Sequence, residues 1–303
     1  MNNYTCKLIS PEQAISLQPQ LPFWFDPQWM YPVAELYNLP AKVLLCSRND
    51  NPVGWMPLYE KKFITLKKAY NPTLVYYSPL FFSYPERAQQ GRELMLEFEI
   101  CKAVGAFLTK NYQRVSLNLM PQNLDIRGFK EAGLKTVPLY TFGVDLHAKT
   151  EIHKHELTTL RKAEKQQYDY VCSYEPDVFM TLLYGMYNRK NHPFPIPREG
   201  LGHLLEKLHI AGLIEQYNVV DKGSIVSSIQ IIKDNSKTAY AWLSGTAPEA
   251  LKNGAGVFLL WKLFEVLQPR YEKLDLCGGN SKGPSRVKAA LGADLQLFFQ
   301  LTK

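Results

Sequence analysis

The feature that most constrains this sequence is the order of patterns in residues 240–303. A β-rich segment is followed by a glycine-containing loop at 252–256 and by a helix with apolar residues three and four positions apart. A second β-rich segment (273–277), a second glycine loop (278–283) with a short helix, and a final β-rich segment follow. A helix between two parallel strands makes a right-handed crossover, which puts both loops at the carboxyl edge of one sheet. We therefore predict an α/β fold with a mixed sheet between two layers of helices, and a ligand site at that edge.

The first loop is a candidate anion site. Its residues Lys252, Gly254, Ala255 and Gly256 lead into the apolar helix. A helix that opens on glycines presents free backbone N–H groups and the positive end of its dipole, which suits a phosphate. A plain turn is the alternative, because glycine and asparagine are also the usual turn residues.

The second loop adds cations and a carboxylate at the same edge. Asp275 stands near the end of its strand and is a candidate base, with a turn cap as the alternative role. Asn280 is expected either to orient a carbonyl or to shape the glycine turn. The cations Lys282, Arg286 and Lys288 follow, and we expect them to neutralise phosphate on a donor or an acceptor. Lys288 is, with Asp275, also a candidate catalytic residue.

Five further residues are candidates for the acceptor side. Tyr240 and Trp242 lie on the strand before the first loop, where alternate residues are as often core. Arg161 and Lys165 share a helical stripe with Lys154, which a solvated basic face explains equally well. Arg189 opens the proline-rich loop 189–197.

Length and charge narrow the classes of function. The chain has 303 residues, 46% hydrophobic and 21% charged, as expected for a globular protein of two lobes. Its net charge of +7 favours anionic partners such as phosphates, a nucleotide cofactor, RNA or anionic lipid head groups, although a charge of this size on 303 residues is equally compatible with no such partner. The five cysteines include no CxxC pair, so we predict neither a metal site nor a disulfide framework. Free cysteines are typical of a reducing compartment, which we therefore expect for this protein. No signal peptide and no apolar run long enough for a transmembrane segment is present, so we expect a cytoplasmic protein.

The two halves of the sequence show similar element orders. The first has β-rich segments at 42–47, 53–59, 63–69 and 73–82, a long helix from 85 to about 111, then a strand (114–119), a short helix (124–132) and a strand (135–146). The second has a strand (170–174), two helices (176–188 and 198–211), three strands (213–220, 224–233, 238–244) and the stretch described above. We predict a tandem duplication, with one lobe at 1–147 and the other at 148–303.

This order, with a glycine loop between a meander strand and the next helix, resembles the GCN5-related N-acetyltransferase (GNAT) superfamily. The segment LKNGAG is similar to the pyrophosphate loop of that superfamily, although Leu251 stands where glutamine or arginine is expected. Within the superfamily, residues 140–303 resemble most the acetyltransferase-like domain of Fem proteins, which add amino acids to peptidoglycan precursors. The similar segments are LTTLRKAEKQ, SGTAPE, LDLCGGN and RVKAALGADL.

The resemblance implies an acyltransferase in which an amine attacks an acyl donor directly in a ternary complex, with acyl-CoA as co-substrate. One alternative is a Fem-like enzyme that takes an amino acid from charged tRNA to a cell-wall precursor. The coiled-coil arm associated with tRNA-dependent members has no counterpart here, which favours acyl-CoA. A non-catalytic binding protein on the same fold is the other alternative. No glycine loop precedes the long helix of the first lobe, so we expect that lobe to bind no CoA and to serve the acceptor or the structure.

Overall fold

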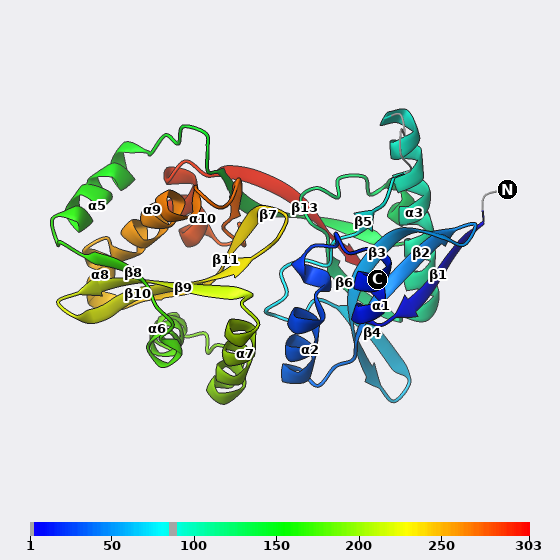
Figure 1. The fold of residues 1–303 in the computed structure, drawn as a ribbon, viewed down its shortest axis with the longest axis horizontal. Helices are drawn as coiled ribbons and strands as arrows, with labels where there is room; N and C mark the ends of the chain where they lie inside the picture. The colour runs from blue at the N-terminus through cyan, green and yellow to red at the C-terminus, as the bar shows by residue number, and fades with distance from the viewer. Residues whose placement is uncertain (1–2, 85–89) are drawn as a thin grey trace. The chain divides into compact units, whose positions relative to one another are not determined.

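The computed structural model describes residues 3–84 and 90–303. The chain divides into two compact units (Figure 1). Unit 1 consists of Met1–Leu139 with Leu297–Lys303, and unit 2 of Tyr140–Gln296. Each unit is a sheet with helices on both faces, as the sequence predicted.

Unit 1 carries its strands in the order β1-β2-β3-β4-β6-β13, with β5 paired to β3. The pair β4–β6 is parallel, and the other pairs are antiparallel. Its strands are β1 (Tyr4–Ile9), β2 (Ala41–Arg48), β3 (Asn51–Phe63), β4 (Leu66–Tyr70), β5 (Phe81–Phe82), β6 (Arg114–Asn118) and most of β13 (Asp294–Thr302). Its helices are α1 (Pro11–Leu17), the 3-10 helix η1 (Phe23–Phe25), α2 (Pro27–Leu36), α3 (Gln90–Asn111) and α4 (Arg127–Glu131).

One hydrophobic core of unit 1 lies between the sheet and α3. Leu96, Ile100, Val104 and Leu108 recur every four residues on this helix and are all buried in that core. The sequence placed the start of this helix at Pro85, and residues 85–89 lie outside the described part of the chain.

Unit 2 carries its strands in the order β7-β12-β11-β10-β9-β8. The pair β11–β12 is parallel, and the others are antiparallel. Its strands are β7 (Lys135–Asp145, of which residues 140–145 belong to this unit), β8 (Asp169–Cys172), β9 (Ile214–Asp221), β10 (Ser224–Lys233), β11 (Thr238–Thr246) and β12 (Lys273–Asp275). Its helices are α5 (Lys154–Glu164), α6 (Pro176–Arg189), α7 (Arg198–Ile210), α8 (Pro248–Lys252), α9 (Ala255–Leu267) and α10 (Lys282–Ala290). In Figure 1, α5, α9 and α10 cover one face of this sheet, and α6 and α7 the other.

Each unit receives its last strand from the other half of the sequence. The end of the first half, β7, pairs with β12 in unit 2, and the end of the second half, β13, pairs with β6 in unit 1. The units therefore differ from the predicted halves, which met between residues 147 and 148: residues 140–147 belong to unit 2 and the final seven residues to unit 1.

Three local expectations differ from the structure. The strand expected at 63–69 begins at Leu66, because Ile64 and Thr65 form the turn of a hairpin between β3 and β4. The segment 73–82 holds only the short strand β5. Residues 248–252, for which the sequence pattern predicts no helix, form α8, with Pro248 at its first position, where the missing proline N–H costs no hydrogen bond.

Candidate functional site

The strands β11 and β12 separate within unit 2. They pair in parallel only from Thr238 to Tyr240, opposite Lys273 to Asp275, although β11 continues to Thr246. On its other side, β11 pairs with β10 up to Thr246, and a register shift leaves Trp242 as an extra residue between Ala241 and Leu243. A bulge of this kind bends a strand and increases its twist. In the described part of the chain, β12 therefore offers no partner to the last six residues of β11.

The predicted glycine loop forms the turn between α8 and α9. Gly254 is the residue before α9 and has a φ of 81°, a left-handed conformation that favours glycine. A Cβ at this position would lie 2.8 Å from the carbonyl oxygen of Thr159 on α5. The Lys162 Nζ of the same helix donates to the carbonyl of Lys252 (2.6 Å). The start of α9 is thus held by α5.

Ala255 and Gly256 lie in the first turn of α9. The first N–H groups of a helix have no acceptor within it, and they carry the positive end of the helix dipole. A Cβ on Gly256 would lie 3.4 Å from the Thr246 Oγ1, so this turn borders the end of β11. The predicted anion site therefore sits beside the separated strand.

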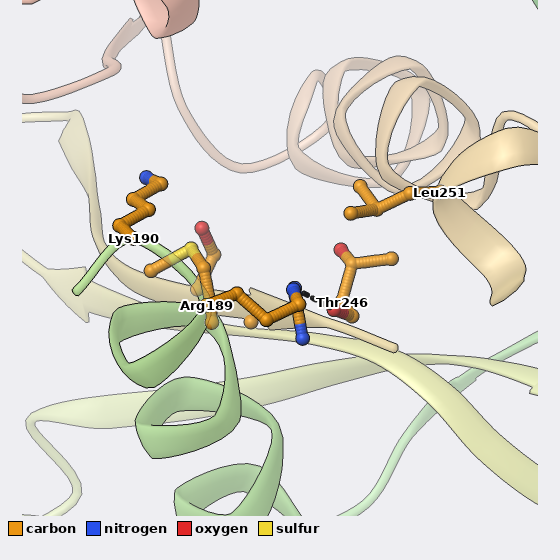
Figure 2. A pocket seen from close by; sticks show the side chains of 7 residues that line it. Arg189, Lys190, Thr246 and Leu251 are labelled. Atoms are coloured by element: carbon orange, nitrogen blue, oxygen red, sulfur yellow. Dashed lines mark hydrogen bonds between the residues drawn. The ribbon is translucent and has the colours of Figure 1, made fainter. Parts of the chain in front are cut away.

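A pocket of about 210 Å³ opens at this end of β11 (Figure 2). Arg189 extends along the strand in Figure 2, and its Nη2 donates to the carbonyl of Thr246 (2.8 Å). Lys190 and Leu251 stand on opposite sides of the pocket. The lining residues are Met186, Arg189, Lys190, Ser244, Gly245, Thr246 and Leu251.

Gly245 explains how α6 brings Arg189 to the pocket. A Cβ on Gly245 would lie 2.5 Å from backbone atoms of Leu182 and Leu183, so only glycine lets α6 pack this closely on β11. The carboxyl end of α6, which carries Arg189, then reaches Thr246. The pocket therefore contains two cations, Arg189 and Lys190, next to the start of a helix.

Lys288 lies in α10 and is turned toward the second glycine loop. Its Nζ donates to the carbonyls of Leu276 (2.7 Å), Cys277 (2.8 Å) and Gly278 (2.6 Å). An ammonium has three protons, and here each has an acceptor. Burial lowers the pKa of Lys288 and raises the pKa of the neighbouring Cys277 thiol well above its usual value.

Asp275 and Asn280 also bind to their own sheet. The Asp275 Oδ1 accepts hydrogen bonds from Thr141 Oγ1 (2.6 Å) and from the N–H of Cys277 (2.8 Å). Asn280 accepts from the N–H of Tyr140 (3.0 Å) and donates to its carbonyl (3.0 Å). These contacts correspond to the turn-forming alternatives considered for both residues, and their functional roles stay predictions.

The remaining predicted residues lie in three places. Lys282 and Arg286 are exposed on α10, and Arg161 and Lys165 are exposed on or just after α5. Lys252 is exposed at the end of α8 and pairs with Glu249 (3.7 Å). Tyr240 and Trp242 are 1% and 2% exposed. The structure thus brings Arg189 together with the glycine turn, whereas the other cations predicted from the sequence (Arg161, Lys165, Lys252, Lys282, Arg286 and Lys288) lie outside the lining of the pocket.

Sequence reasoning missed Lys190, Ser244 and Thr246 as pocket residues. Their signals were present, since Lys190 follows Arg189 and the other two belong to the segment SGTAPE. It also missed a buried polar network on β9 and β10. There the Gln230 Nε2 donates to Gln216 Oε1 (3.1 Å), and Gln216 Nε2 and Ser228 Oγ both donate to Asn218 Oδ1 (2.8 and 2.6 Å). A connected network of this kind fixes the relative positions of the strands that support β11.

Two negative findings apply to the described residues. Among residues 3–84 and 90–303, no group of three or more His, Cys, Asp or Glu side chains is arranged to hold a metal ion. Within the same residues, no helix is both long enough and apolar enough to span a bilayer.

Comparisons with known proteins show which family and which solved structures the chain resembles. Residues 157–282 match a family model described as an acetyltransferase (GNAT) domain. A search of curated proteins returns no significant match.

Solved structures resemble most or nearly all of the chain at low sequence identity. The crystal structure of FemX has a TM-score of 0.65 at 11% identity, covering 97% of this chain and 96% of FemX. The C-terminal domain of a putative lysylphosphatidylglycerol synthetase from Agrobacterium fabrum has a TM-score of 0.54 at 14% identity, and the match covers 82% of this chain and 80% of that domain. A tandem GNAT protein from the clavulanic acid biosynthesis pathway has a TM-score of 0.50 at 9% identity, and the match covers 99% of this chain and 98% of that protein. Residues 157–282 are therefore similar to a GNAT acetyltransferase domain, and the chain has a two-lobe fold like those of FemX and a tandem GNAT protein.

Proposed function

We propose that the protein is an N-acyltransferase that moves an acyl group from acyl-CoA to an amine by direct attack in a ternary complex. One observation carries the proposal. A pocket with two cations and the first turn of α9 lies at the end of β11, the strand that separates from β12. This arrangement offers an anion site next to a backbone edge, as a phosphate-bearing chain such as CoA requires.

The pocket suits the phosphate portion of the donor. The amides at the start of α9 supply donors and dipole, and Arg189 and Lys190 supply charge. Its volume of about 210 Å³ is smaller than that of a site enclosing a whole cofactor. The rest of the donor would lie along Ala241–Thr246, where β12 leaves the edge of β11 uncovered.

The transfer needs few side chains. The amine nitrogen forms a bond to the acyl carbon, the carbon–sulfur bond breaks, and the amine loses one proton while the thiolate gains one. Asp275 is our candidate to receive that proton, since two hydrogen bonds hold its carboxylate where the strands separate. Lys288 acts as a positioning residue, because it fixes the loop that follows Asp275. Acceptors are expected to be amine-bearing small molecules or cell-wall precursors.

Calorimetric titration with acetyl-CoA and CoA tests the donor site. In Gly256→Asp, a carboxylate faces the bound phosphates, and we expect affinity to fall at least about tenfold. An acidic residue in the first turn of a helix is favourable, so the variant should keep its fold. Gly256→Ala is the matched control, because its Cβ would meet Thr246 Oγ1 at 3.4 Å and Leu251 Cδ2 at 3.9 Å, close to ordinary contact.

Equal affinity of Gly256→Asp and wild type would remove the donor from this pocket. No binding of either ligand to wild type would overturn the acyl-CoA proposal and favour the second candidate, an aminoacyltransferase that uses charged tRNA. The observation behind that candidate is α5, which holds the glycine turn and carries the exposed cation Arg161, with the exposed Lys165 directly after its end. Binding of tRNA that weakens steeply with salt would then support it.

A further inference from the structure

The turn between β3 and β4 projects from the sheet of unit 1 and is strongly basic. In Figure 1 this hairpin extends below the label of β4. Residues 61–68, which we name the basic hairpin, read KKFITLKK: four lysines, three apolar residues, one threonine and no carboxylate. None of the functions considered above uses this segment.

The apolar residues of the basic hairpin are at its tip. Ile64 is 96% exposed and Phe63 is 54% exposed. Ile64 also has a φ of 37°, a region that β-branched residues avoid and that glycine, asparagine or aspartate normally occupy in turns. The turn would form more easily with a polar residue here, so the folding of the hairpin does not explain the isoleucine.

The lysines are arranged in opposed pairs. In the register of the two strands, Lys61 faces Lys68 and Lys62 faces Lys67. Like charges directly opposite each other destabilise a strand pair. Of these four lysines, only Lys67 forms an ion pair with another described residue, the carboxylate of Glu60 (2.6 Å). Successive residues of a strand point to opposite faces, so each face of the hairpin carries a lysine pair just behind the apolar tip.

The base of the hairpin is well anchored. The Tyr112 hydroxyl donates to Glu60 (2.5 Å), and this carboxylate also holds Lys67. Gln113 pairs with Lys67 through its side chain (2.8 Å, from the N–H of Lys67) and its backbone (3.0 Å, to the carbonyl). The tip is therefore presented on an ordered support, which limits the entropy lost when it binds a partner.

We propose that the basic hairpin docks the protein on a bilayer that contains anionic lipids, with Phe63 and Ile64 at the level of the head groups and the lysines against lipid phosphates. An apolar tip flanked by lysines fits this interface, which offers apolar chains below and negative charge above. A nucleic acid would engage the lysines but would leave Ile64 in water. The inference is independent of the acyl donor.

Sedimentation of the full chain with vesicles tests this assignment. We expect binding to vesicles of phosphatidylcholine mixed with phosphatidylglycerol, weaker binding at high salt, and little binding to phosphatidylcholine alone. Each lysine near such a surface contributes about fivefold, so Lys61→Gln with Lys62→Gln should weaken binding about 25-fold. Ile64→Asn should weaken it about tenfold while the melting temperature stays equal or rises, because asparagine tolerates a positive φ.

Leu124→Asn is the matched control. Leu124 is an apolar residue of unit 1 outside the hairpin, 62% exposed, and its replacement should leave vesicle binding unchanged. The assignment is overturned if wild type ignores the anionic vesicles or if Ile64→Asn binds them as wild type does. If wild type binds tRNA but no vesicles, and Lys61→Gln with Lys62→Gln weakens the binding of tRNA, the hairpin is a nucleic-acid contact and the assignment is overturned.

Discussion

At the scale of single residues, Lys288 shows how a charge can hold a loop in shape. Its three hydrogen bonds go to successive carbonyls, those of Leu276, Cys277 and Gly278. Cys277 and Gly278 have φ angles of 48° and 82°, so the loop turns through left-handed backbone where its carbonyls converge on one donor. The loop after β12 therefore depends on this ammonium for its conformation.

We expect Lys288→Met to destabilise the protein by about 3 kcal/mol, because three carbonyls lose a charged donor inside the fold. Urea denaturation measures the loss. Lys282→Met, an exposed change on the same helix, should stay within about 0.5 kcal/mol of wild type. If the two variants were equally stable, the lysine would be free to serve a ligand instead.

The sequence indicated the edge at which Asp275, Asn280 and Lys288 lie, because strand and loop patterns are local. It could not indicate their partners. Asn280 binds the backbone of Tyr140, and Asp275 binds Thr141, both more than 130 positions away. Gly245 was missed for the same reason, since its need for a missing side chain arises only when α6 packs on β11.

At the scale of elements, an ion pair ties β9 to the segment after α9. Arg270 donates to both carboxylate oxygens of Glu215 (2.8 Å each), and the Tyr217 hydroxyl donates to one of them (2.7 Å). The hydrogen bonds from Arg270 are the main cause that lowers the pKa of Glu215 from 4.5 to about 2. The helix α9 is thus held at both ends: α5 contacts the turn before its start, and Glu215 of β9 binds Arg270 after its end.

A carboxylate with a depressed pKa stabilises the fold above its unfolded pKa. The stability is present above about pH 4.5 and is lost as the pH falls toward about 2. We expect Glu215→Gln to cost about 1–2 kcal/mol at pH 7, less than the full shift implies because Arg270 is 43% exposed. The difference from wild type in urea denaturation should shrink between these pH values. Glu272→Gln, which breaks an exposed pair with Lys237, should change little at any pH, and a constant effect of Glu215→Gln would contradict the pKa assignment.

The two units differ where β11 separates from β12. In unit 1 the equivalent parallel pair is β4–β6, and the chain after β4 returns along β6. The N–H of Asn118 donates to Asn71 Oδ1 (2.7 Å), and the N–H of Ser78 donates to the carbonyl of Asn118 (2.7 Å). The protein's own backbone thus lies beside β6 in unit 1, which supports the proposal that this unit binds no CoA.

At the scale of the whole molecule, the repeated element order was visible in the sequence because each element has its own periodicity. The exchange of β7 and β13 was not. Whether β7 pairs in unit 2 and β13 in unit 1, or the reverse, the same alternating residues face the core of the same type of sheet. The periodicity of the sequence therefore does not tell which unit each of the two strands joins. The position of the boundary between the units depended on that choice.

The exchange predicts that a residue near the end of the sequence stabilises unit 1. Leu301 is fully buried in the core around α3, so Leu301→Ala should cost about 2–4 kcal/mol. Hydrogen exchange should show lost protection in β6, with β9 and β10 unchanged. Leu295→Ala on the same strand, 59% exposed, is the control. Loss of protection in β9 and β10 alone would contradict the assignment of β13 to unit 1.

The exchanged strands also bear on synthesis at the ribosome. Domains usually fold in the order in which they are made. Here the strand that completes unit 2, β7, is synthesised before the rest of that unit, whereas unit 1 lacks β13 until residues 297–302 have been added. During synthesis the sheet of unit 1 therefore has one edge of β6 without the strand β13. Unit 1, most of which is synthesised first, is completed last.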